Sequence, residues 1–292
     1  MARIAVALSL SIAGTVCAPG VAVGREPAPA LPKGASDISD TQRGKQVIRE
    51  ARERYERLGH TSGELRAVKD GRGILVVPKR AKLVVYGSTL KGGRNLPLLA
   101  PVTADDPAWV REEATATELV AAAAPSWTFV GNHCYTQTSD TFAVLDHCYT
   151  KYKLANDGSS RYDWYALHRF GTARNNSPWV LDQARIRAYR HGGSSQAWAD
   201  WSPKSNWSGG SCSTVSIGIS TPVGGISQSF DRCPERITFT KSANGSQPDY
   251  TQTWFGMGTR GNREVRFEIS VRVTQGGTAT WTLPAQVIGG PF

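Results

Sequence analysis

The chain has 292 residues, of which 40% are hydrophobic and 20% charged, as in soluble globular proteins of one large or two ordinary domains. Its formal net charge of +10 suits anionic partners such as acidic wall polymers, but solvated arginine-rich faces are the more common reason for such a charge. We expect no specific nucleic acid partner. Beyond the N-terminus no apolar run approaches about 18 residues, which excludes a later membrane-spanning helix.

The N-terminus has the pattern of a secretory signal peptide. Arg3 precedes an uncharged run from Ile4 to Val16, which is too short to span a membrane. Small residues at Ala22-Val23-Gly24 suit a signal peptidase. We therefore expect residues 1–24 to be removed together with Cys17, no transmembrane segment after signal removal, and a secreted, extracellular protein.

Residues 25–125 are predicted to form a basic α+β segment or pro-region with a helical tether. From Arg43 to Arg94 there are 14 Lys and Arg against 5 Asp and Glu, a net charge of +9. Ser39 and Gln42 fit a capping box, and Gly59 supplies a helix stop. Apolar residues recur between them at helical spacing, at Val47, Ala51, Tyr55 and Leu58.

Two strands and a second helix are predicted in the rest of this segment. The strands are Ile74 to Val77 and Ala81 to Tyr86, with Pro78 confining the first to a sheet edge or a turn. The helix runs from Pro107 to Ala123, with Asp106 as its cap.

Residues 126–292 are predicted to form a disulfide-bonded antiparallel β domain, so the fold class is a mostly β antiparallel β-sandwich with hairpin disulfides. Short strands recur every 10–15 residues between turn residues from Trp127 onward. The clearest strand is Glu264 to Thr274, with one buried and one wet face. A three-residue loop, Gln275-Gly276-Gly277, would then pair Val271 with Trp281.

The mature chain retains four cysteines, which allow three disulfide pairings. Pairing Cys134 with Cys148, and Cys212 with Cys233, closes two hairpins in register. The second would place Val215 opposite Phe230 and Ile219 opposite Ile226.

The sequence His-Cys-Tyr-Thr occurs twice, at 133–136 and 147–150, and suggests a zinc site. Neighbouring residues of a strand point to opposite faces, so the histidines would lie on one face and the cysteines on the other. We therefore favour a disulfide beneath cross-strand aromatic pairs, His133 with Tyr149 and Tyr135 with His147, and predict no metal or other cofactor.

A tryptophan-rich stretch is the candidate ligand-binding site. Aromatic rings on loops, with polar groups beside them, suit an extracellular polysaccharide or acidic wall polymer. The alternative is that the tryptophans fill the end of the sandwich core. The predicted ligand-binding residues are Trp198, Asp200, Trp201, Asn206 and Trp207.

Two other functional classes stay open. A secreted hydrolase would use acid pairs such as Asp163 with Asp200 or Asp182 with Asp231, but no known catalytic motif occurs, so we assign no catalytic residue and favour a non-enzyme.

A membrane-active β toxin would use Val215 to Thr221 and Ile226 to Phe230, where apolar residues alternate with Ser and Gly. Arms of five to seven residues are shorter than the 9–11 of a membrane strand, so we favour a buried hairpin.

The stretch Trp201-Ser202-Pro203, followed by Cys212 to Cys233, resembles uncharacterised secreted proteins of high-GC Gram-positive bacteria. The resemblance covers residues 127–275 and implies export and a β-rich disulfide-bonded domain. It transfers no activity and no site residues.

Overall fold

The computed structural model describes residues 28–60, 62–103, 126–139, 142–155, 158–209, 213–221, 224–232 and 236–291. In these ranges the protein is mostly β with antiparallel pairing and one α-helix, which confirms the predicted fold class. No helix in the described ranges has the length and apolar character needed to cross a membrane. The predicted signal peptide and the predicted helix from Pro107 to Ala123 lie outside the described residues.

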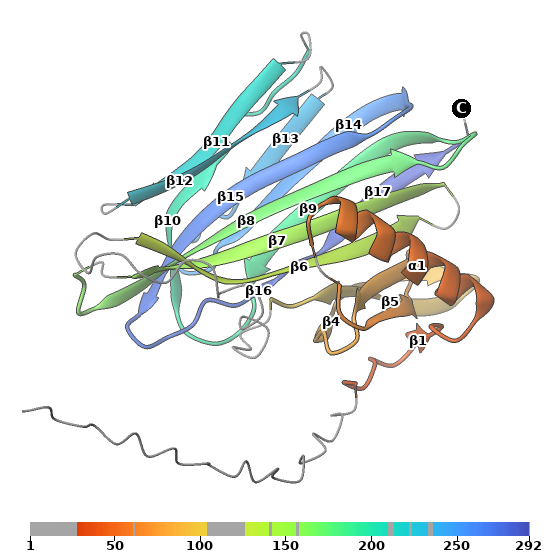
Figure 1. Ribbon diagram of the computed structural model, residues 1–292, viewed down its shortest axis with the longest axis horizontal. Helices are drawn as coiled ribbons and strands as arrows, with labels where there is room; N and C mark the ends of the chain where they lie inside the picture. The colour runs from red at the N-terminus through yellow and green to blue at the C-terminus, as the bar shows by residue number, and fades with distance from the viewer. Residues whose placement is uncertain are drawn as a thin grey trace, which may run out of the picture.

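An eight-stranded sheet forms one layer (Figure 1), in the order β1-β2-β3-β6-β7-β8-β15-β10. Its N-terminal strands join the later ones through β3 and β6, where Leu75 pairs with Gln137 and Val76 with Thr136. The strands are β1 (Ser36–Asp37), β2 (Leu65–Lys69), β3 (Ile74–Pro78), β6 (Ser126–Ser139), β7 (Ala143–Ala155), β8 (Tyr162–Asn175), β10 (Gln196–Ser202) and β15 (Arg263–Thr274).

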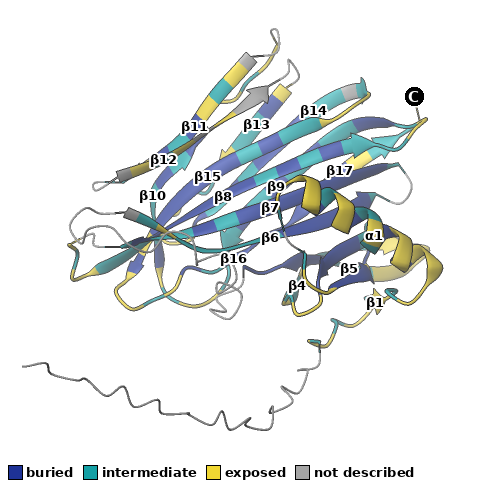
Figure 2. Ribbon diagram, in the orientation of Figure 1, coloured by how far each residue is buried: buried dark blue, intermediate teal, exposed yellow. Residues whose placement is uncertain are grey.

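A five-stranded sheet forms the second layer, in the order β13-β14-β9-β16, with β17 also pairing β9. The two sheets enclose the main hydrophobic core, visible as dark blue strand segments in Figure 2, with Trp254, Phe267 and Trp281 at most 1% exposed. Its strands are β9 (Val180–Arg190), β13 (Arg236–Lys241), β14 (Asp249–Thr259), β16 (Trp281–Thr282) and β17 (Ala285–Gly290).

Two further hairpins each form a separate two-stranded sheet. One consists of β4 (Leu83–Lys91) and β5 (Arg94–Pro101), and the other of β11 (Ser213–Thr221) and β12 (Gly224–Arg232). In Figure 1 the β11–β12 hairpin lies outside the sandwich, beside β10 and β15.

The predicted helix is α1 (Gln42–Arg57), but its N-cap is Thr41 rather than Ser39. The Thr41 hydroxyl accepts a hydrogen bond from the Gly44 N–H at 3.0 Å, whereas Ser39 Oγ accepts one from the Ala67 N–H of β2 at 2.9 Å. Gly59 ends the helix with a φ of +77°, a conformation that favours glycine. Val47, Ala51 and Tyr55 are buried as expected, but Leu58 is 44% exposed.

Strand lengths and one pairing differ from expectation. The strands are not short: β6 and β8 each contain 14 residues. Val271 pairs with Trp198 of β10 and Tyr165 of β8, not with Trp281, which pairs with Arg190 of β9. The chain therefore crosses to the other sheet after β15 instead of turning back beside it.

The predicted position of Pro78 is confirmed in part. β3 lies inside the sheet between β2 and β6, so it is not an edge strand. Pro78 is its last residue and accepts a hydrogen bond from the Ala81 N–H, which closes the predicted turn. The missing N–H of proline thus interrupts no pairing with β6, because that pairing involves only Leu75 and Val76.

Candidate functional site

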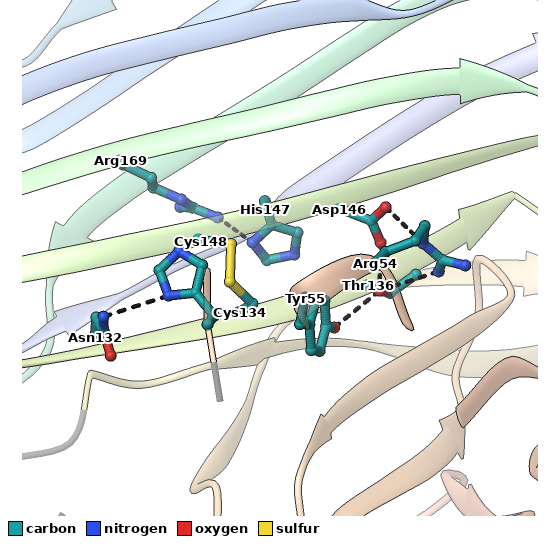
Figure 3. The surroundings of a disulfide bond; sticks show 10 residues. Arg54, Tyr55, Asn132, Cys134, Thr136, Asp146, His147, Cys148 and Arg169 are labelled. Atoms are coloured by element: carbon teal, nitrogen blue, oxygen red, sulfur yellow. Dashed lines mark hydrogen bonds and ion pairs between the residues drawn. A yellow bond between two sulfur atoms is a disulfide. The ribbon is translucent and has the colours of Figure 1, made fainter. Parts of the chain in front are cut away.

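The Cys134–Cys148 disulfide joins β6 and β7, as predicted (Figure 3). His133 pairs with Tyr149 and Tyr135 with His147, which confirms the predicted register. The disulfide lies in a small hydrophobic cluster under α1, whereas Tyr135 and Tyr149 belong to the main core on the other side of the sheet.

The cysteine sulfurs are also near one histidine, but not one of the repeat. His60, which follows α1, places a ring nitrogen within 4.8 Å of both sulfurs. Both sulfurs are bonded to each other, so they are not thiolates in this structure. The side chain of His147 is instead buried beside Arg169, whose Nη2 lies 3.1 Å from its Nδ1.

Asp146 of β7 holds α1 on the sheet. Its Oδ2 lies 2.7 Å from Arg54 Nε and 2.9 Å from Arg174 Nη1, and its Oδ1 accepts a hydrogen bond from the Thr136 hydroxyl at 2.5 Å. The Tyr55 hydroxyl is 2.8 Å from that of Thr136. Figure 3 shows this network on the helix side of the sheet, where the Asp146 side chain is 3% exposed.

Two of the predicted ligand-binding tryptophans are neighbours. The rings of Trp198 and Trp201 lie 5.8 Å apart, edge to face, and both are half-buried against the main core. The ammonium of Lys241 lies 4.3 Å from the Trp201 ring centroid and 5.3 Å from that of Trp198. Polysaccharide binding by these rings stays a prediction.

The other predicted site residues have structural partners of their own. Trp207 forms an isolated bridge with Ile237, and the Asn206 side-chain oxygen accepts a hydrogen bond from the Phe239 N–H at 2.8 Å. Asp200 pairs opposite Ser270, whereas Trp201 pairs opposite the core residue Ile269. Asp200 and Trp201 therefore point to opposite faces of the sheet.

Asp200 faces the β11–β12 hairpin and binds its first strand. Its Oδ2 accepts hydrogen bonds from the Ser220 N–H at 2.7 Å and the Ser220 hydroxyl at 3.2 Å, while Lys204 Nζ lies 2.9 Å from Oδ1. Burial acts to raise the pKa of Asp200, but the bonds from Ser220 and Lys204 outweigh it and lower the pKa. A second contact comes from the Ser202 hydroxyl, which accepts from the Gly218 N–H at 3.2 Å.

Apolar residues alternate with polar ones in the middle of the hairpin, from Val215 to Ile219 and from Ile226 to Phe230, whereas the end pairs Ser213–Arg232 and Thr221–Gly224 contain none. Val215 pairs with Phe230 and Ile219 with Ile226, as predicted, but each arm has nine residues rather than five to seven. Ile217 and Ile219 are 1% and 3% exposed, whereas Ser216 and Ser220 on the other face are exposed. Cys212 and Cys233, one position beyond the pair Ser213–Arg232, lie outside the described residues, so their disulfide stays a prediction.

Comparison with known proteins identifies no family. No protein-family model matches the sequence, and no curated protein does. Among solved structures, the chain is similar to one titled "Pore forming protein", with a TM-score of 0.32 and 7% identity over 71% of this chain and 91% of that chain. So distant a likeness carries no argument about activity.

A buried carboxyl group lies beneath the hairpin and was missed by the sequence analysis. Glu268 of β15 was expected on a wet face, but it is 1% exposed, and Ser270 beside it is fully buried. Neither Glu268 carboxylate oxygen has a hydrogen-bond partner of acceptable geometry among the described residues. Burial raises the pKa of Glu268 to about 8, and the nearby Ile219 backbone N–H offsets part of the rise.

Both acids of the first pair considered for hydrolysis, Asp163 and Asp200, bind other groups. Asp163 Oδ2 accepts a hydrogen bond from the Gly276 N–H at 2.8 Å and lies 3.3 Å from Lys153 Nζ. Asp200 binds the hairpin, and the side chain of Asp231 lies outside the described residues. The described geometry therefore adds no support for a glycosidase.

Proposed function

We propose that the protein is secreted and permeabilises lipid membranes by releasing the β11–β12 hairpin from the sandwich and inserting it into the bilayer. One observation carries the proposal: this hairpin has nine-residue arms with alternating apolar residues in their middle, and it forms its own sheet beside β10 and β15.

The length of the arms fits a bilayer. Nine residues at about 3.3 Å each span about 30 Å, the thickness of a typical hydrocarbon core, and tilted membrane strands have about 9–11 residues. The arms expected from the sequence were too short for this, which was the main argument against membrane insertion. A disulfide between Cys212 and Cys233 would join the base of the hairpin and leave the arms intact.

The attachment of the hairpin suits release. Neighbouring strands of a sheet are normally joined by a ladder of backbone hydrogen bonds, but among the described strands β11 pairs only with β12. Toward the sandwich, its backbone N–H groups bind side chains instead, Gly218 to Ser202 and Ser220 to Asp200. Undocking therefore breaks no strand pairing.

Insertion requires several copies of the protein. Edge strands of a lone hairpin would leave backbone groups unpaired in lipid, each at a cost of several kcal/mol. Hairpins from neighbouring copies would pair edge to edge, with the apolar face that contains Ile217 and Ile219 toward lipid. The face that contains Ser216 and Ser229, whose hydroxyls lie 2.8 Å apart, would face water.

Dye release from phosphatidylcholine vesicles, with and without phosphatidylglycerol, tests the proposal. Replacing the paired Ile219 and Ile226 by serine should reduce the leakage rate at least tenfold. Each isoleucine side chain transferred from water into lipid contributes about 1.5–3 kcal/mol to the free energy of insertion. The matched control replaces the paired Ser216 and Ser229 by alanine and should leak like the wild type. Because weaker docking alone would speed leakage, a loss of leakage identifies lipid contact.

A fluorophore placed along β11 provides the contradicting outcome. An environment-sensitive dye on Val215→Cys should shift to the blue on vesicle binding, and the same dye on Ser216→Cys should not. Equal shifts at both positions, or no leakage by the wild-type protein from either vesicle type, would refute insertion of this hairpin.

Asp200→Ala should accelerate leakage. The variant removes the hydrogen bonds that Asp200 accepts from Ser220. The free energy that holds the hairpin docked should therefore fall by about 1–3 kcal/mol, and vesicle leakage should start sooner. Asp163→Ala is the matched control, because Asp163 also accepts from a backbone N–H and pairs with a lysine, but away from the hairpin. Equal acceleration in both variants would point to general destabilisation.

A further inference from the structure

The outer face of the five-stranded sheet carries a regular array of polar side chains. Thr238 of β13 pairs with Thr253 of β14, which pairs with Arg185 of β9, which pairs with Gln286 of β17. A parallel row lies two residues further along each strand and consists of Thr240, Thr251 and Arg187. Paired residues point to the same face, so both rows lie on the side away from the core residues Ala184 and Ile186.

Two adjoining hollows follow these rows. One has a volume of about 470 Å³ and contains both rows together with Tyr86 of β4 and Phe255 of β14. The other, of about 570 Å³, continues past Arg187 toward Tyr189 and Arg190. Both include Arg187 and Asp249, which form an ion pair at 2.5 Å, so the hollows meet at this pair.

The charge of the combined cleft is positive. The ionisable groups that line it at neutral pH are Arg185, Arg187, Arg190 and Asp249, so three positive charges face one negative charge, a net of +2. Arg187 uses Nε and Nη2 on Asp249, and Arg185 uses Nε on the Thr253 hydroxyl at 3.2 Å. The remaining N–H groups of Arg185 are suitable donors for a ligand carboxylate or sulfate.

We propose that this cleft binds an acidic oligosaccharide, a sugar chain that bears carboxylate or sulfate groups. The proposal is independent of membrane insertion. Hydroxyls in two rows, about 4.8 Å apart between strands and about 6.7 Å apart along them, offer repeated donors and acceptors to sugar hydroxyls. Tyr86, Tyr189 and Phe255 offer aromatic rings to the apolar faces of sugars, and the arginines bind the acid groups.

The size of the cleft favours a chain of sugars over a single anion. A free phosphate or sulfate ion occupies only a small part of two hollows of this volume. An extended saccharide would lie along both and meet the positive charge near their junction.

Affinity measurements with the full chain test the proposal without any membrane. The probes are polygalacturonate and heparin, and the matched neutral probe is methyl-esterified polygalacturonate, which has the same backbone without free carboxylates. Binding to at least one acidic polymer, at least tenfold tighter than to the neutral one and weaker in high salt, is the expected result.

Variants locate the site. Arg185→Gln should weaken binding of the acidic polymer at least tenfold, and Thr240→Val should weaken it less. Arg272→Gln is the matched control, since Arg272 is an exposed strand arginine on the other sheet that packs over Tyr162. Trp201→Ala, checked for folding by circular dichroism, separates the cleft from the tryptophan pair, because binding in the cleft should make it lose far less affinity than Arg185→Gln.

Several outcomes would overturn the assignment. Equal losses in Arg185→Gln and Arg272→Gln would mean attraction by net charge alone. A loss in Trp201→Ala but not in Arg185→Gln would place the saccharide at the tryptophan pair. Equal affinity for the acidic and methyl-esterified polymers would exclude an acidic oligosaccharide as the ligand of this cleft. So would a failure to bind both polygalacturonate and heparin.

Discussion

Glu268→Gln should unfold at a higher temperature than the wild-type protein at pH 8, by roughly 5–10 °C. Burial under β11 raises the pKa of Glu268 to about 8, against about 4.3 in water. At pH values between these two pKa values, Glu268 keeps its proton in the native protein but has lost it in the unfolded chain. The free energy of unfolding therefore falls by about 1.4 kcal/mol for each unit that the pH rises. The two pKa values imply a loss of about 5 kcal/mol at pH 8. Glutamine keeps the shape of the side chain but also buries an amide, so it should recover only part of this, on the order of 3 kcal/mol.

The pH range of the measurement follows from the buried histidines. Burial lowers the pKa of His133 to about 4 and of His168 to about 3, and lowers that of His147 well below its ordinary value. These groups stay neutral in the native protein and become charged on unfolding below about pH 6.5, so they make stability rise with pH up to that value. Above it they contribute nothing, and the effect of Glu268 stands alone.

The expected curves are therefore distinct. The melting temperature of the wild type should peak near pH 6.5 and fall toward pH 8, whereas that of Glu268→Gln should stay level over this range. The titratable groups that face Glu268 from neighbouring strands are His168 on β8, Tyr152 on β7 and Asp200 on β10. All three change charge outside this range, because Tyr152 has a raised pKa and the other two lowered ones. A level wild-type curve would contradict a buried, uncharged Glu268.

The same carboxyl group connects stability to the proposed release of the hairpin. Undocking β11 exposes Glu268 to water, where it ionises, so rising pH favours the released hairpin over the docked one. Wild-type leakage should be faster at pH 8 than at pH 6.5. The glutamine variant should leak more slowly at pH 8 and show no difference between the two pH values, as dye release measured side by side would show.

Local pairings were predictable from the sequence because alternation fixes them. The Cys134–Cys148 register and the Val215–Phe230 register each involve two strands joined by a short loop, and a slip of one residue would reverse the faces. The amphipathic pattern of α1 was equally local. In these cases the chain itself limits which residues can meet.

Contacts between distant segments were not predictable in this way. Val271 and Trp281 were predicted to pair across a short loop, but β15 pairs with β8 and β10 in the first sheet while β16 joins β9 in the second. The burial of Glu268 arises from a hairpin about 50 residues earlier in the chain. Periodicity marks one face of β15 as apolar, but it contains no information about what covers the other face.

The polar rows of the cleft illustrate the same limit at a candidate site. Alternating threonines and arginines in β9, β13 and β14 are ordinary patterns for solvated sheet faces when each strand is taken alone. Only the strand order β13-β14-β9 brings them side by side. The tryptophans, conspicuous in the sequence, are partly buried against the main core, and their role in ligand binding stays a prediction.

Asp146→Ala should destabilise the protein by about 3–5 kcal/mol, the usual cost of removing one partner from a buried ion pair. Arg54 and Arg174 would then face each other without the carboxylate that lies within 2.9 Å of both. The melting temperature should fall by roughly 10 °C. The contact joins residues 92 positions apart, so its loss should also free α1 from the sheet.

Glu50→Ala is the matched control for this prediction. Glu50 contacts the same arginine at 4.0 Å, but its side chain is 43% exposed, and exposed pairs contribute about 0–1 kcal/mol. Hydrogen exchange of α1 amides should rise strongly in Asp146→Ala and little in Glu50→Ala. Equal melting temperatures for the two variants would mean that α1 is held by its apolar contacts, Val47, Ala51 and Tyr55, because the charge network would then contribute no more than an exposed pair.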